Sequence, residues 1–138
     1  MKQSPIFTRT YDLLRWLIPM TVKFPRQQRF VLAGAVQRTA LRFQERLIEA
    51  ARAPDPLPVL RQADVDLIKL RFYLRLCRDL QLMGMGQYAH AARMVNEVGR
   101  LLGGWLKSVI EAQESESDES DKPSDETEEV QGKEDKEE

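Results

Sequence analysis

Arginine is the residue type in this sequence whose spacing best suits a chemical task, and that task is the binding of anions. Arg71, Arg75 and Arg78 stand at positions i, i+4 and i+7, so a helix places all three on one face. A guanidinium group offers a planar set of donors that fits a phosphate or a carboxylate with two hydrogen bonds. Like charges at this spacing repel one another, so we expect an anion to offset them. That anion belongs either to an external partner or to an acid of the same chain.

A second row of arginines follows the same rule earlier in the chain. Arg38, Arg42 and Arg46 are spaced by four residues, and Arg26 and Arg29 lie just ahead of them. Solvated helix faces are one interpretation of such rows. Because few acids accompany them, we expect at least one continuous positive patch, for which nucleic acid is the commonest partner.

The charge of the chain is divided by position. Residues 1–110 carry 18 Lys and Arg against 8 Asp and Glu, a net charge of +10. Residues 111–138 carry 3 Lys against 14 Asp and Glu, a net charge of −11. The second segment has one large apolar residue, Val130, and cannot bury enough surface to offset the entropy of ordering. We therefore predict a folded basic domain over residues 1–110 and a disordered acidic tail over residues 111–138.

Residue types that perform catalysis are scarce in the basic domain. The chain has one cysteine, Cys77, and one histidine, His90, which are far apart in sequence and cannot form a structural zinc site. The carboxylates are scattered, which argues against a two-carboxylate hydrolase or a metal-dependent nuclease. The sequence thus predicts a protein that is not an enzyme and has no cofactor or metal. The lone cysteine in a helical run favours a reducing, intracellular compartment and a core position.

Four helices are expected, over about residues 9–23, 25–52, 58–81 and 87–110, because apolar residues recur there at helical spacing. Pro19 should kink or interrupt the first of them. No strand pattern competes. Long helices joined by short breaks favour an all-α, antiparallel four-helix bundle. The best apolar run is too short to span a bilayer, so no membrane insertion is expected.

Glycines lie in the break before the last predicted helix and inside that helix. The Met83–Gly86 run has no strand before it and no Lys-Ser/Thr after it, so it predicts a turn between helices rather than a nucleotide loop. Gly99, Gly103 and Gly104 lie inside the last helix, where each costs ~1 kcal/mol relative to alanine. Either the helix breaks at the glycine pair, or the glycines admit a neighbouring helix beside Trp105. The apolar spacing continues beyond them and favours the second interpretation, including a contact between subunits.

Several stretches carry a resemblance to a known family: Tyr11-Asp12, Phe24-Pro25-Arg26, Ala50-Ala51-Arg52, Leu70–Arg75 and Glu97–Ser108. Together they resemble the accessory variability determinant (Avd) proteins, which belong to diversity-generating retroelements of phages and bacteria. The resemblance covers about residues 10–110. The Gly-Arg-x-x-Gly-Gly-Trp run and the Leu-Arg-x-x-Leu-Arg run are its most specific parts.

The resemblance implies a four-helix bundle that assembles into a homopentamer. With the intracellular compartment that the lone cysteine favours, we expect a cytoplasmic protein encoded by a bacterium or a phage. It implies a basic surface that binds DNA and RNA, and a reverse transcriptase as protein partner. The role implied is non-catalytic support of mutagenic copying from template RNA to cDNA. The match at Leu70–Arg75 implies that Arg71 and Arg75 bind the partner. A related bundle of the rRNA intervening-sequence type, which binds RNA without a polymerase, is the alternative.

Overall fold

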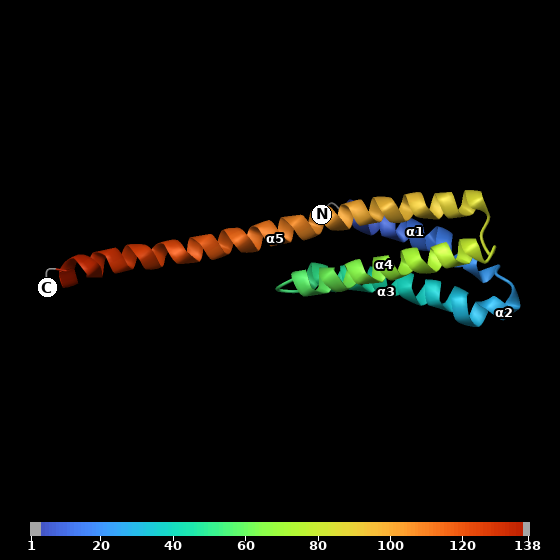
Figure 1. The fold of residues 1–138 in the computed structure, drawn as a ribbon, viewed down its shortest axis with the longest axis horizontal. Helices are drawn as coiled ribbons and strands as arrows, with labels where there is room; N and C mark the ends of the chain where they lie inside the picture. The colour runs from blue at the N-terminus through green and yellow to red at the C-terminus, as the bar shows by residue number, and fades with distance from the viewer. Residues whose placement is uncertain (1–3, 137–138) are drawn as a thin grey trace. The chain divides into compact units, whose positions relative to one another are not determined.

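The fold is built from helices that run alternately up and down one bundle (Figure 1). The structure is a computed structural model and describes residues 4–136, apart from the side chains of residues 28–30 and 119–136. The elements are α1 (Pro5–Val22), α2 (Arg26–Gln28), η1 (Arg29–Ala33), α3 (Gly34–Arg52), α4 (Leu57–Asp79) and α5 (Met85–Lys136). Within these described residues there is no strand. The predicted all-α, antiparallel four-helix bundle is confirmed.

The bundle core occupies the unit formed by residues 1–106. α3 packs most extensively on α4, and α1 packs on α3. α1, α3, α4 and α5 each contribute apolar side chains that are almost fully excluded from solvent, among them Leu17, Phe43, Leu70 and Val98. Cys77 is also buried, as its position in an apolar run predicts, and burial raises the pKa of its thiol to about 11.

Two helix irregularities differ from the sequence prediction. α1 begins at Pro5 and continues through Pro19 to Val22, so Pro19 does not interrupt the helix, while a kink there stays a prediction. Pro19 removes the helical hydrogen bond to the Arg15 carbonyl, but α1 ends only three residues later, so little helix remains beyond the proline to be interrupted. The predicted second helix is present as α2, η1 and α3 in direct succession. Its one departure from α geometry is the π-helical turn at Arg29–Ala33.

The connection from α4 to α5 reverses the chain through a left-handed residue. Gln81 has φ 64°, while no described glycine has positive φ. The Leu82 N–H donates to the Cys77 carbonyl at 2.8 Å, and the Gln81 N–H donates to the Arg78 carbonyl at 2.9 Å. This is the hydrogen-bond pattern of a Schellman motif, which usually has glycine at the left-handed position. The predicted turn at Met83–Gly86 is therefore displaced toward α4, because the α4 C-terminus already reverses the chain.

α5 starts with a side-chain cap. The side-chain oxygen Oε1 of Gln87 accepts a hydrogen bond from the Gly84 N–H at 2.9 Å, which is one half of a capping box. Met85 and Gly86, which the sequence assigns to the turn, therefore form the first helical positions. Gly103 and Gly104 do not break α5.

Residues 107–136 belong to a second unit of the chain. The helical backbone of α5 continues through this unit to Lys136, where the composition predicts disorder. None of its side chains up to Asp118 is fully buried, so no packed apolar face supports the helix there. The disorder of this acidic segment stays a prediction. Among the described residues no helix is long and apolar enough to cross a membrane.

We predict that Gln81→Gly stabilises the protein by about 0.5–1 kcal/mol. An L-residue in the left-handed region costs about 1–2 kcal/mol, and glycine removes that cost while losing part of the gain to its greater freedom in the unfolded chain. Urea unfolding followed by circular dichroism measures the difference. Gly84→Ala provides the comparison, since Gly84 lies in the same connection with negative φ. A loss of stability in Gln81→Gly would contradict the conformation assigned to Gln81.

Candidate nucleic-acid interface

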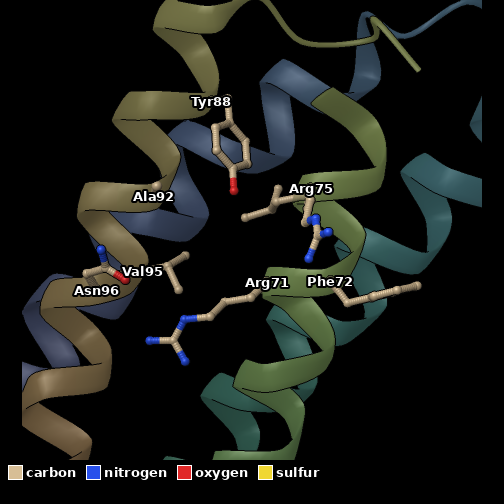
Figure 2. A pocket seen from close by; sticks show the side chains of 8 residues that line it. Arg71, Phe72, Arg75, Tyr88, Ala92, Val95 and Asn96 are labelled. Carbon is tan, nitrogen blue, oxygen red and sulfur yellow. The ribbon is translucent and has the colours of Figure 1, made fainter. Parts of the chain in front are cut away.

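A cavity of about 390 Å³ lies between α4 and α5. Its lining combines two cations, two neutral polar groups and an apolar floor, from Arg71, Phe72, Leu74, Arg75, Tyr88, Ala92, Val95 and Asn96. Figure 2 shows the Arg71 and Arg75 side chains rising from α4, while Tyr88 and Asn96 face the same space from α5. No acidic residue is part of this described lining. The cavity is therefore suited to a ligand that carries negative charge.

Arg71 owes its position to a glycine on the facing helix. A Cβ atom built on Gly99 would lie 2.5 Å from Nη2 of Arg71, closer than such atoms approach in real structures. The guanidinium therefore occupies space that any other residue at this α5 position would fill. Gly99 thus lies where α4 and α5 are in close contact, and the Arg71 side chain fills the space beside it.

Arg78 lies about two helical turns beyond Arg71 on α4. Its guanidinium lies 4.6 Å from the centre of the Tyr88 ring, and its Nη2 lies 2.8 Å from Oδ1 of Asp79. The stacking and the ion pair restrict this side chain and place it against the wall of the cavity. Arg78 is therefore partly neutralised within the chain, unlike its two neighbours.

Arg71 and Arg75 are exposed, and neither forms an ion pair with any acid in the described part of the chain. The sequence left open whether acids such as Asp12, Glu45 or Glu49 would neutralise this row. In the structure Asp12 pairs with Arg9, and Glu49 pairs with Arg46. The two guanidinium groups beside the cavity are thus available to an external anion.

Arg42 and Arg46 belong to a different environment. Both approach Asp66 of α4, which is only 4% exposed, with Arg42 Nη1 at 3.9 Å and Arg46 Nε at 3.6 Å. At these separations the contacts are charge pairs rather than hydrogen bonds. Asp66 precedes Arg71 by five residues, which is about 140° around a helix of 3.6 residues per turn. The structure therefore does not bring the second arginine row together with Arg71 and Arg75.

The remaining predicted residues lie apart from the cavity or outside the description. Arg26 and Arg38 are exposed and have no ion pair with a described residue. The side chain of Arg29 lies outside the described residues. Trp105 packs against Phe7 of α1, with 6.2 Å between the ring centres, so it joins two helices of the same chain.

Gly103 and Gly104 are exposed, and a Cβ atom on either would meet nothing within 4 Å. Within one chain, therefore, these two glycines do not serve a close helix contact. A contact between copies of the chain stays a prediction.

Phe72, Tyr88 and Asn96 are not predicted by the rows of like charge in the sequence. The signal that could have found Phe72 is its place between Arg71 and Arg75 on the outward side of an amphipathic helix. Tyr88 and Asn96 had no such signal, because their role depends on how α5 packs against α4. The described residues contain no group of three or more His, Cys, Asp or Glu side chains that could hold a metal ion.

We predict that Gly99→Ala and Gly103→Ala differ in stability although both replace a glycine in the same helix. Alanine in place of glycine should stabilise α5 by about 1 kcal/mol at Gly103, where space is open. At Gly99 the gain should be smaller, because Arg71 must leave its place to admit the methyl group.

Urea unfolding measures both variants, and a crystal structure of Gly99→Ala shows the guanidinium of Arg71. Equal stabilisation with Arg71 unmoved would disprove the close contact. The mass of the Gly103→Ala variant in solution shows whether the added methyl group disturbs a contact between copies, which would offset the gain in helix stability.

The comparison with known protein families covers most of the bundle. The family model described as bAvd-like matches residues 5–109, which run from the start of α1 to beyond the cavity-lining part of α5. No curated protein gives a significant match. The match includes the Leu70–Arg75 and Glu97–Ser108 stretches on which the sequence resemblance depends. The chain therefore belongs to the bAvd-like family of accessory variability determinant proteins.

Proposed function

We infer that this protein is a non-enzymatic accessory protein of a diversity-generating retroelement that binds nucleic acid through the α4–α5 face. One observation carries the nucleic-acid part: Arg71 and Arg75 border a cavity without acidic lining and have no ion pair with a described acid. Guanidinium groups in this state bind phosphates, and the phosphate backbone supplies most of the affinity of non-specific nucleic-acid binding. Membership of the bAvd-like family supports the retroelement context.

A reverse transcriptase is the second partner in this proposal. It is supported by the family resemblance, in which Arg71 and Arg75 bind the partner. The same two arginines would then meet polymerase carboxylates or template phosphates, since both are anions that fit a guanidinium fork. The protein's contribution would be to hold the polymerase and its RNA near each other, while the polymerase performs the chemistry of copying.

A homo-oligomer, with the family's pentamer as the expected form, completes the proposal. A body of about 110 residues is small for a stable monomer, and exposed apolar side chains such as Val31 and Leu41 remain on its surface. The exposed Gly103 and Gly104 fit a close contact between copies. Repetition of the arginine face around a ring would multiply phosphate contacts and raise avidity.

We predict that the double variant Arg71→Ala/Arg75→Ala binds RNA more weakly and with a flatter salt dependence. Each lost phosphate contact lowers the slope of log K against log salt concentration by about 0.7 for single strands and 0.9 for duplexes. Two lost contacts therefore lower it by about 1.4–1.8. Fluorescence anisotropy with labelled RNA over a salt series measures the slope.

The matched control is Arg15→Ala/Arg52→Ala, which removes the same charge from two exposed arginines outside this cavity. In this control the slope of log K against log salt concentration should change less than in Arg71→Ala/Arg75→Ala. If both double variants lose affinity and slope equally, binding depends on net charge alone, and the assignment to the α4–α5 face is wrong.

We further expect the chain to copurify with the reverse transcriptase of its own retroelement and to be required for cDNA synthesis from the template RNA. Reconstitution with and without the protein measures this requirement. Full cDNA synthesis in its absence would contradict the accessory role. RNA binding without any association with the polymerase would instead favour the rRNA intervening-sequence type of function.

A further inference from the structure

Phe72 is an exposed aromatic residue that takes no part in the core packing of the bundle. Its side chain lies on the outward side of α4 and the residue is 62% exposed, although an aromatic ring of this kind is normally a core component. Its ring contact with Tyr73, at 5.9 Å between centres in an edge arrangement, leaves most of the residue in contact with solvent. An apolar ring held this way is a candidate for contact with a partner.

The surroundings of Phe72 indicate the chemistry of that partner. Arg71 precedes it, Arg75 follows it one turn later, and all three residues line the same cavity. Figure 2 shows the Arg75 guanidinium beside Phe72, and Arg71 extended toward α5. One cation beside an exposed ring, and a second on the side of α4 that faces α5, match a ligand in which phosphates alternate with flat apolar groups. Single-stranded nucleic acid is such a ligand.

The cavity itself has the properties needed for one nucleotide. Its volume of about 390 Å³ falls in the ~300–1,000 Å³ range that is typical of small-ligand sites. Leu74, Ala92 and Val95 supply apolar surface, and the Tyr88 hydroxyl points into the space between α4 and α5 (Figure 2). Arg78 covers the Tyr88 ring, so this tyrosine offers its hydroxyl rather than a stacking face. Tyr88 and Asn96 can therefore hydrogen-bond a ribose or the edge of a base.

A double helix cannot use this arrangement. Its bases are paired and stacked on one another, so a ring on the convex side of a helix reaches a base only after the base leaves the stack, which costs free energy. The phosphates of a duplex can still reach Arg71 and Arg75. The ring and the cavity thus add affinity for single strands alone, while the arginines add affinity for both forms.

We propose that the α4–α5 face is a binding site for single-stranded nucleic acid, in which Phe72 stacks on a base, Arg71 and Arg75 hold the adjacent phosphates, and the cavity receives a neighbouring nucleotide. This rests on the proposed nucleic-acid function and deepens it. Gly99 is a positioning residue for the site, because it provides the space in which the Arg71 guanidinium lies.

A second copy of the chain is the competing occupant of this surface. Val65 and Ile68 are exposed on the same side of α4, at helical spacing from Phe72, and form an apolar stripe with it. Charge favours nucleic acid, because the stripe ends beside two arginines without acidic partners. In a ring of copies this face would meet a different face of its neighbour, and residues 1–110 offer only 8 acids against 18 Lys and Arg to neutralise Arg71 and Arg75 there.

The test compares Phe72→Leu with wild type, using a short fluorescein-labelled RNA alone and annealed to its complement. Leucine keeps the apolar character and removes the stacking ring. Single-strand affinity should fall about 5- to 150-fold, the range that corresponds to one lost base stack, while duplex affinity stays unchanged. Phe72→Tyr should keep the wild-type affinity, and Ile68→Ala, which removes another exposed apolar side chain from α4, should leave both affinities unchanged.

The outcomes separate the proposal from the function on which it rests. If Phe72→Leu binds both RNA forms as wild type does, or weakens both equally, the single-strand site is disproved while nucleic-acid binding stands. If Phe72→Leu changes the mass of the assembly in light scattering and leaves RNA affinity unaltered, the ring belongs to an interface between copies. If wild type binds neither RNA form, the proposed function itself fails.

Discussion

The scarcity of carboxylates in the basic body is the constraint on which the rest of the structure depends. Residues 1–110 contain 18 Lys and Arg but only 8 Asp and Glu, so most cations cannot be neutralised within the fold. The position of each acid then decides which arginines form ion pairs within the bundle and which remain free to bind an external anion. Asp66 illustrates the effect: almost fully buried, it requires positive charge nearby, and Arg42 and Arg46 of α3 supply it.

α4 consequently has two different sides. On one side Asp66 draws the α3 arginines onto the helix and contributes to the most extensive contact of the bundle. On the other side Arg71 and Arg75 stand beside a cavity that has no acidic lining. A ligand on that second side does not compete with the ion pairs that join α3 to α4. The fold therefore separates the charge that helps to hold it together from the charge that it can offer to a partner.

Apolar periodicity predicted the helices, and the short breaks between them predicted the antiparallel arrangement, because both are local properties of the chain. The local signals of proline and glycine misled at Pro19 and at the α4–α5 connection, where the outcome depends on position along the helix and on the left-handed conformation of Gln81. The clustering of Arg71, Arg75 and Arg78 was visible in the sequence. The pairing of Arg42 and Arg46 with Asp66 was not, since it depends on which acid a neighbouring helix brings within reach.

The two exposed arginines of the cavity are held to different degrees, and this difference bears on how the face can bind. Arg71 extends over Gly99 between α4 and α5, whereas no described glycine has Arg75 among the nearest atoms to its Cβ position. A side chain already ordered loses less conformational entropy when it binds, so Arg71 should contribute more net affinity per hydrogen bond than Arg75. Arg75 keeps the freedom to follow phosphates of varied spacing. Contacts of both kinds are to the backbone of a nucleic acid, which fixes its position without reading its bases.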